Sequence, residues 1–128
     1  MPRPQVVIVG AGIGGLSAAR ALARAEVEVT VVDARNHHTF QPLLYQVCTG
    51  GLSPGDIASP IRSVLRRYPN ARVVHDEAID VRSSPLAVVL RSAGALACSH
   101  LIVATGSQTS YFGHDDWEKW APGLKSVE

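Results

Sequence analysis

The chain has 128 residues, of which 46% are hydrophobic and 18% are charged, and its formal net charge is +1. This length suits one compact domain, and the composition excludes a mainly disordered chain. The near-neutral charge offers no basic stripe and argues against nucleic acid as a partner.

The two cysteines, Cys48 and Cys98, are too few for a disulfide scaffold and lack metal-ligand spacing. No apolar run approaches the roughly 20 residues of a membrane-spanning helix. The short N-terminal apolar run is broken by glycines and is not typical of a signal peptide. We therefore expect a reduced, intracellular, soluble globular protein without a metal site.

The first elements form a βαβ unit. Residues 5–9 (QVVIV) are apolar on both faces and predict a buried parallel strand. The glycine-rich stretch 10–15 follows, and residues 16–25 have the apolar spacing of a helix. Residues 27–32 predict a second strand, closed by Asp33.

Residues 34–55 form a long segment rich in glycine and proline with an apolar insert, FQPLLYQV. A loop of this length inside a compact domain is usually functional. A helix is expected over residues 57–67, capped by Ser53 or Asp56, with Pro60 in its first turn or bending it.

The remaining elements are shorter. Residues 72–75 and 78–82 predict strands, and residues 86–90, a turn at 92–95 and a return near Ala97 predict an antiparallel meander. Residues 101–104 (LIVA) predict a buried strand that ends at Thr105-Gly106. The fold class expected is therefore α/β: a parallel sheet with helices and a small antiparallel meander.

The motif G-x-G-x-x-G at Gly10, Gly12 and Gly15 stands between a strand and a helix, with an acid at the end of the next strand. Gly10 permits a tight turn, Gly12 lets a pyrophosphate approach the backbone, and Gly15 permits close packing of the helix. Asp33 is placed to accept hydrogen bonds from ribose hydroxyls. The alternative is a plain tight turn with a solvated acid, but the surrounding elements favour an adenine dinucleotide site.

The same βαβ unit binds either FAD or NAD. An NAD domain continues with alternating helices and strands, whereas this chain inserts an apolar loop and a meander. The loop is suited to cover a flavin ring, and Thr105-Gly106 supplies a second glycine turn. These features favour FAD.

Three segments resemble the type II NADH:quinone oxidoreductases of bacteria, the non-proton-pumping NADH dehydrogenases. They are VVIVGAGIGGLSAARALA, VTVVDARNHHTFQPLLYQVCTGGLSPGDIASPIR and LIVATGSQTSYFGHDDWEKWAPGLKSVE. The resemblance spans nearly the whole chain. FQPLLYQV, SPGDIASPIR and YFGHDDWEKWAPGLK are much more specific than the glycine motif, which many flavoproteins share.

The resemblance implies a Rossmann-like FAD-binding domain of the two-dinucleotide-binding flavoprotein type. Family members pass a hydride from NADH to FAD and electrons to a membrane quinone, as peripheral proteins on the cytoplasmic face of the membrane. By this resemblance Ala78 meets the adenine, and the loop 42–47 lies near the flavin ring. The residues expected to bind FAD are Gly10, Ala11, Gly12, Ile13, Gly14, Gly15, Asp33, Ala34, Arg35, Pro42, Leu43, Gln46, Ala78, Ala104, Thr105 and Gly106.

Family members are about three times as long, so we expect residues 1–106 to be a partial FAD-binding domain. Residues 107–128 would then begin the connection toward an NADH-binding domain. The second glycine-rich βαβ and the membrane-binding helices would be missing, so this chain alone is expected to be inactive. The unpaired edge of strand 101–104 is expected to favour self-association, unless the tail with Trp117 and Trp120 folds over it.

Two other interpretations remain open. One is a fragment of another quinone reductase such as a sulfide:quinone oxidoreductase, although the cysteine positions do not suggest its catalytic thiols. The other is an inactive dinucleotide-binding module.

Several residues that could suggest chemistry are given plain structural interpretations. Cys48 is interpreted as a plain apolar residue, and the acids at 115, 116 and 118 as a solvated face. His37 and His38 are interpreted as solvated loop residues.

Overall fold

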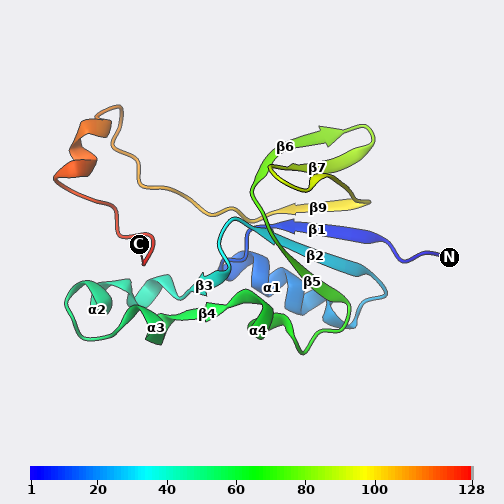
Figure 1. The fold of residues 1–128 in the computed structure, drawn as a ribbon, viewed down its shortest axis with the longest axis horizontal. Helices are drawn as coiled ribbons and strands as arrows, with labels where there is room; N and C mark the ends of the chain where they lie inside the picture. Colours follow the sequence, from blue (N-terminus) through cyan, green and yellow to red (C-terminus); the bar gives the residue numbers. More distant parts are fainter. Residues whose placement is uncertain (128) are drawn as a thin grey trace.

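A four-stranded parallel sheet forms the centre of the computed structural model, which describes residues 1–127. Its strands are β1 (Gln5–Val9), β2 (Glu28–Asp33), β5 (Ala71–His75) and β9 (His100–Val103). Their order is β5-β2-β1-β9, so β1 lies between β2 and β9 (Figure 1). The last strand, β9, pairs with β1 in parallel register, with Val6–Val9 opposite His100–Val103.

Helices cover one face of this sheet. They are α1 (Ile13–Ala21), which continues into the 3-10 turn η1 (Leu22–Arg24), and α4 (Ile61–Leu65). Alternate strand residues point toward them and form a buried core. Together with residues of the glycine turn and the helices, its buried members are Val6, Ile8, Ala11, Leu16, Ala19, Val29, Val31, Ile61 and Leu65. Burying an aliphatic side chain of this kind contributes about 1.5–3 kcal/mol, so this layer fixes α1 against β1 and β2.

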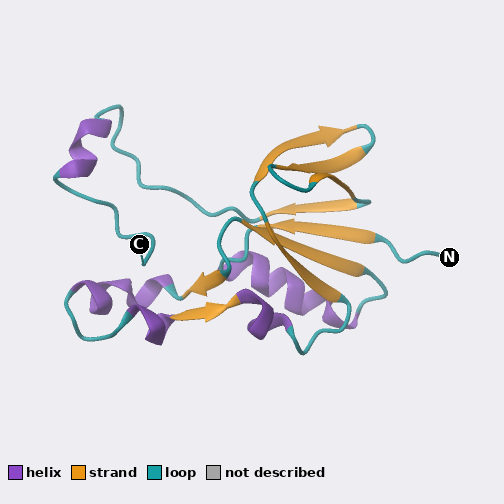
Figure 2. Cartoon of the chain, viewed as in Figure 1, coloured by secondary structure: helices purple, strands orange, loops and turns teal. Residues whose placement is uncertain are grey.

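The other face of the sheet is covered by the predicted meander. It consists of β6 (Ala78–Ser83), β7 (Leu86–Leu90) and β8 (Gly94–Ala97), paired antiparallel (Figure 2). Val7 and Val32 pack against Val88 and Leu90 in a second buried cluster. Because both faces are covered, β1 and β2 are apolar on both sides, as their sequences indicate.

Residues 37–60, expected to be a long loop and the start of a helix, instead form an arm of short elements. These are β3 (His37–Thr39), the 3-10 turn η2 (Gln41–Leu43), α2 (Leu44–Cys48), α3 (Pro54–Ile57) and β4 (Ala58–Pro60). β3 and β4 pair antiparallel. Ser53 caps the short helix α3 rather than the expected helix 57–67, and its N–H and hydroxyl both donate to Asp56 Oδ2 at 2.8 Å.

Two helix predictions were wrong in their bounds. The expected helix 57–67 is interrupted by β4, because Pro60 has no N–H to donate and forces the preceding residue toward an extended conformation. The first helix begins at Ile13 rather than residue 16, because the glycines of the motif itself form its first turn.

The tail after β9 leaves the sheet and returns near the arm (Figure 1), where Gln41 Nε2 donates to the Lys125 carbonyl at 3.2 Å. It contains one 3-10 turn, η3 (Asp115–Lys119). It does not cover β9 in the part of the chain that the structure describes, and Val103 is 67% exposed. Within residues 1–127 no helix has the length and apolar character needed to cross a membrane.

Asn70 joins the helical layer to the sheet. Its side chain is 8% exposed, and its Nδ2 donates to the carbonyls of Leu22 at 3.0 Å and Val27 at 3.1 Å. The same residue's carbonyl accepts the Val29 N–H at 2.8 Å. Asn70 therefore satisfies carbonyls at the end of η1 and fixes the start of β2.

We predict that Asn70→Asp destabilises the fold by about 1–3 kcal/mol, because the carboxylate cannot donate to buried carbonyls. Urea unfolding followed by circular dichroism measures the effect. Asn36→Asp, at an exposed position, is the matched control and should unfold like the parent. Equal unfolding free energies for the two variants would contradict this role.

Candidate functional site

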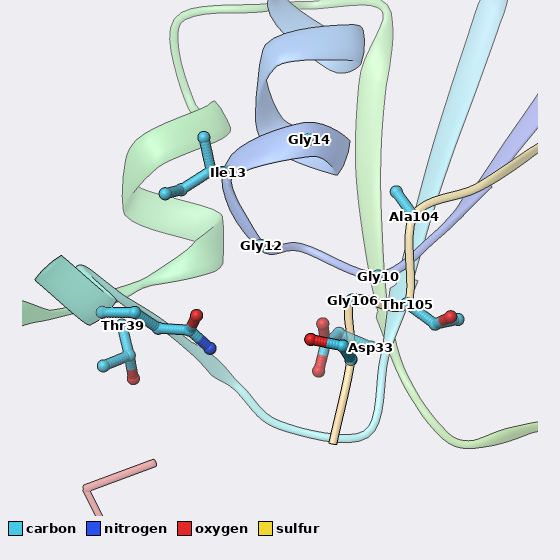
Figure 3. A pocket seen from close by; sticks show the side chains of 11 residues that line it. Gly10, Gly12, Ile13, Gly14, Asp33, Thr39, Ala104, Thr105 and Gly106 are labelled. Carbon is cyan, nitrogen blue, oxygen red and sulfur yellow. The ribbon is translucent and has the colours of Figure 1, made fainter. Parts of the chain in front are cut away.

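The carboxyl ends of β1, β2 and β9 meet at one edge of the sheet, and a cleft of about 380 Å³ lies there (Figure 3). The chain runs from β1 to β2 on one side and returns through β9 on the other. This arrangement is a topological switch point, where open α/β sheets bind ligands. The cleft is lined by Gly10, Gly12, Ile13, Gly14, Asp33, Thr39, Gln41, Ala104, Thr105, Gly106 and Ser107.

The three motif glycines differ in what surrounds them. Gly10 has a φ of +102°, and a Cβ there would collide with the Ala104 carbonyl. A Cβ on Gly15 would collide with the Gly10 carbonyl. Gly12 has an ordinary φ of −72°, and a Cβ there meets no protein atom within 4 Å. Gly10 and Gly15 therefore permit contact between backbone segments, whereas Gly12 keeps the cleft open.

Helix α1 begins at this cleft. Gly12 is its N-cap residue, and its first turn carries no acidic side chain. The N–H groups of a first helical turn have no partner within the helix and carry a partial positive charge. The cleft therefore offers an anion several backbone donors at the end of a helix dipole.

Asp33 holds the glycine turn from the opposite side. Its Oδ2 accepts the Ala11 N–H at 2.6 Å, and its Oδ1 accepts the Arg35 N–H at 2.8 Å. A carboxylate has about four acceptor positions, so these two bonds leave capacity for further donors in the cleft. Asp33 thus orders the turn and presents acceptor oxygens beside it.

A second hollow of about 340 Å³ adjoins the first and shares Gly10, Asp33 and Thr105 with it. Ala34 and Ala78 give it small apolar surfaces. Its other lining residues are Val9, Val32, Asp76, Glu77 and Gln108. The two hollows therefore lie on either side of Asp33.

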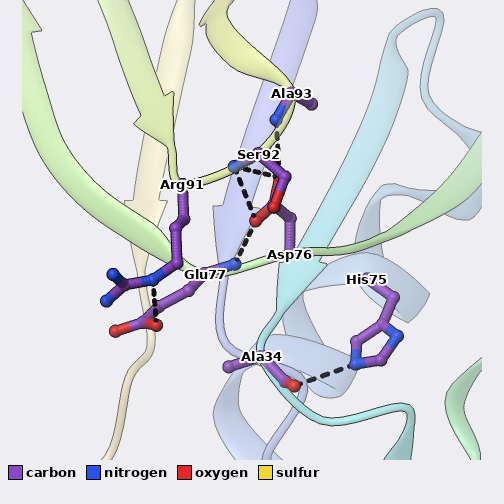
Figure 4. A network of polar contacts seen from close by, with 7 residues as sticks. All are labelled: Ala34, His75, Asp76, Glu77, Arg91, Ser92 and Ala93. Carbon is purple, nitrogen blue, oxygen red and sulfur yellow. Dashed lines mark hydrogen bonds and ion pairs between the residues drawn. The ribbon is translucent and has the colours of Figure 1, made fainter.

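A polar network supports the second hollow (Figure 4). The Asp76 carboxylate accepts the N–H groups of Glu77 at 2.8 Å and Ala93 at 2.9 Å, and that of Ser92. Desolvation acts to raise the pKa of Asp76, but these backbone bonds outweigh it and hold the pKa below its usual value. Asp76 therefore remains ionised at neutral pH and ties β5 to the meander.

Glu77 and His75 complete this network. Arg91 Nε donates to Glu77 Oε2 at 2.7 Å, and this bond and the Arg91 charge lower the pKa of Glu77. His75 Nε2 lies 2.9 Å from the Ala34 carbonyl. Because a carbonyl oxygen can only accept, this nitrogen carries the proton and holds Ala34 beside the hollow.

Most residues predicted from the sequence come together around these two hollows. Ala11 and Gly15 are buried behind the glycine turn and support it. Besides Ala11 and Gly15, four other predicted residues among those described line neither hollow. They are Arg35, Pro42, Leu43 and Gln46.

Several lining residues were missed from the sequence. Asp76 and Glu77 directly follow β5, and their place at the end of a parallel strand was the signal that could have identified them. Thr39, at the end of the unexpected strand β3, and Gln41, at the start of η2, also line the cleft. His38 was expected to be solvated, but its Nδ1 lies 2.9 Å from the Ala11 carbonyl.

Neither cysteine lines these hollows in the described chain. Cys48 is exposed on the arm, and burial raises the pKa of the half-buried Cys98. No group of three metal-ligating side chains occurs among residues 1–127. The backbone donors at the start of α1 can bind a phosphate-containing ligand in the cleft, and carboxylates line the other end.

The sequence matches the family described as pyridine nucleotide-disulphide oxidoreductase over residues 4–126. The type II NADH:quinone oxidoreductase NdhA of Mycobacterium tuberculosis is 47% identical over 129 residues, which cover 98% of this chain and 27% of that protein. Ndh of the same organism is 43% identical, covering 98% and 28%. The chain thus spans about a quarter of the length of these relatives.

Solved structures agree with this relationship. The structure of NDH2 from Plasmodium falciparum in complex with NADH matches with a TM-score of 0.84 at 26% identity, covering 98% of this chain and 27% of that one. A sulfide:quinone oxidoreductase from Aquifex aeolicus matches with a TM-score of 0.75 at 22% identity, covering 84% and 25%, and shares the fold.

These comparisons confirm the resemblance to type II NADH:quinone oxidoreductases and the Rossmann-like α/β fold class inferred from the sequence. The glycine turn, the acid at the end of β2 and the second turn after β9 line one cleft at the switch point of the sheet. The chain belongs to the pyridine nucleotide-disulphide oxidoreductase family.

Proposed function

We propose that this chain is the FAD-binding part of a type II NADH:quinone oxidoreductase. The observation that carries the proposal is the cleft at the switch point, where Gly12, the first turn of α1 and the Ala104–Gly106 turn face one space. The 47% identity to a relative of that activity, across 98% of this chain, supports it.

The residues present fit an adenine dinucleotide with a pyrophosphate in its middle. Gly12 leaves room for the pyrophosphate, because no protein atom occupies the space that its side chain would take. Asp33 stands beside this position with unused acceptor capacity for ribose hydroxyls. The hollow with Ala34 and Ala78 is suited to an adenine ring.

Two features favour FAD over NAD as the ligand of this site. The cleft extends past the glycine turn to a second turn at Thr105, Gly106 and Ser107, which is placed to contact the ribityl chain of a flavin. The arm that carries η2 and α2 supplies an apolar segment next to the lining residue Gln41. We propose that Pro42, Leu43 and Gln46 lie toward the flavin ring, and that Arg35 lies toward the adenosine.

Each part of the site has a binding or orienting role in this proposal. The first turn of α1 neutralises phosphate charge, Asp33 orients the ribose, and the turn at Thr105-Gly106 contacts the chain between phosphate and ring. When bound, FAD supplies the capacity to accept a hydride from NADH and to pass electrons to a quinone. This chain's own residues hold the cofactor in place for that exchange.

The activity of the whole protein is part of the same proposal. Residues 1–106 act as the FAD-binding part, and residues 107–128 begin a connection toward an NADH-binding domain. NADH and a quinone are the proposed substrates of the whole protein. We propose that the whole protein is peripheral and lies at the cytoplasmic face of the cell membrane. The open edge of β9 is the proposed surface of self-association for the 128-residue chain.

A sulfide:quinone oxidoreductase is the second candidate, and it is less favoured. Its structural likeness at 22% identity supports the fold alone. Cys48 and Cys98 lie outside both hollows of the described chain, so the site offers no thiol next to the proposed cofactor.

We predict that Gly12→Val abolishes FAD binding without unfolding the chain, because the new side chain projects into the cleft and meets no protein atom. Flavin fluorescence quenching and urea unfolding measure the two effects. Gly55→Val, at an exposed helix position away from the cleft, is the matched control. Equal FAD affinity for the two variants would show that the cleft is not the site.

We predict that Asp33→Ala weakens FAD binding by about 1–3 kcal/mol, since ribose hydroxyls lose their acceptor and the Ala11 N–H loses its partner. Isothermal titration calorimetry with FAD and with NADH tests both the site and the preference. Asp116→Ala, on the exposed tail, serves as the control. Tighter binding of NADH than of FAD by the parent chain would overturn the assignment of the cofactor.

We predict that the purified 128-residue chain, supplied with FAD, does not oxidise NADH with a quinone. Hydride transfer needs the donor held within about 3–3.5 Å of the acceptor, and the described residues form one dinucleotide cradle. Absorbance at the NADH band measures turnover. Steady NADH consumption by the parent chain, lost in the Gly12→Val variant, would contradict this expectation.

A further inference from the structure

Ala11 is held from both sides, by the side chains of Asp33 and His38. Its N–H donates to Asp33 Oδ2 at 2.6 Å, and its carbonyl lies 2.9 Å from His38 Nδ1. Ala11 itself is 2% exposed. A residue at the centre of the glycine turn is thus fixed by two side chains from different elements, one at the end of β2 and one on β3.

The direction of the His38 bond is determined by its partner. A carbonyl oxygen only accepts, so Nδ1 of His38 carries the proton and donates. Protonation of the ring adds its proton at Nε2 and leaves this bond in place. The contact therefore specifies the Nδ1–H form of the neutral ring.

This bond sets the orientation of the next peptide group. The Ala11–Gly12 peptide is planar and trans, so its C=O and N–H point in opposite directions. With the carbonyl directed to His38, the Gly12 N–H is directed away from His38. Within residues 1–127 this N–H has no protein acceptor, and Gly12 lines the cleft.

Neighbouring residues of β3 lie on opposite sides of the glycine turn. Successive side chains of a strand point to opposite faces. Thr39 lines the cleft, whereas His38 lines a separate small hollow with Ile13, Leu16 and Phe40. The pairing of His38 with Ser59 on β4 holds the ring at that position.

We propose that His38 is a positioning residue for the dinucleotide: by holding the Ala11 carbonyl, it presents the Gly12 N–H to the pyrophosphate. The proposal rests on the FAD site described above. A positioning role differs from a packing role. Packing requires only a side chain of suitable shape, whereas positioning requires a hydrogen-bond donor at the position of His38 Nδ1.

Asparagine and leucine distinguish these roles. Both have nearly the same shape, and the asparagine amide nitrogen is as many bonds from Cα as Nδ1 of histidine. We expect His38→Leu to weaken FAD binding about tenfold, the effect of one lost hydrogen bond. Its unfolding midpoint should also fall, because the buried Ala11 carbonyl loses its donor, so binding is measured where the variant is folded. We expect His38→Asn to bind within about threefold of the parent. His100→Leu, at an exposed position on β9, is the control.

The experiment is a calorimetric FAD titration of the four proteins, combined with ¹⁵N NMR of the His38 ring in the parent. Loss in the leucine variant, recovery in the asparagine variant and an Nδ1–H ring support the proposal. Equal loss in both variants, no loss in either, or a neutral ring protonated at Nε2 overturns it. If the parent binds no FAD, the proposed function fails and the role of His38 fails with it. If the parent binds FAD but His38→Leu binds equally well, only the role of His38 fails.

Discussion

Close contact between three backbone segments at the end of β1 is the constraint on which the site depends. The turn at Gly10 touches the backbone after β9, and the first turn of α1 at Gly15 touches the Gly10 carbonyl. Side chains at these positions would separate the segments. The contacts bring the end of the first strand, the start of the first helix and the end of the last strand to one point. The cleft is the space that remains in front of them.

The groove around this point is electrostatically polarised. The start of α1 supplies backbone donors and a partial positive charge, which suit phosphate oxygens. Beyond Asp33 the lining becomes acidic, with Asp76 and Glu77 both held ionised by hydrogen bonds and by Arg91. Such a groove attracts phosphates at one end and hydroxyl donors at the other. It suits the pyrophosphate and ribose of a dinucleotide lying in one direction.

Local patterns explain what the sequence could predict. The unit β1–α1–β2 was predictable because its strands, glycine spacing and acid are contiguous, and the meander was predictable from short runs with a turn. The arm was not, because the pairing of His38 with Ser59 joins residues without a periodic pattern. Pro60 interrupted a helix that apolar spacing alone favoured. Asp76 reaches the site only because β5 ends at the same edge as β2, which is a property of the sheet order. The solvated interpretation of His38 failed for the same reason, since its partner Ala11 lies in a different element.

The most direct test of the central claim is a ¹H–¹⁵N NMR titration of the 128-residue chain with FAD. We expect the largest shifts, at saturating FAD, at the amides of Gly12, Gly14, Ala34, Thr105 and Gly106, on both sides of Asp33. Amides on the far end of the sheet, such as those of Val27 and Asn70, should remain unchanged. Shifts confined to residues outside the two hollows, or no shifts at saturating FAD, would contradict the account.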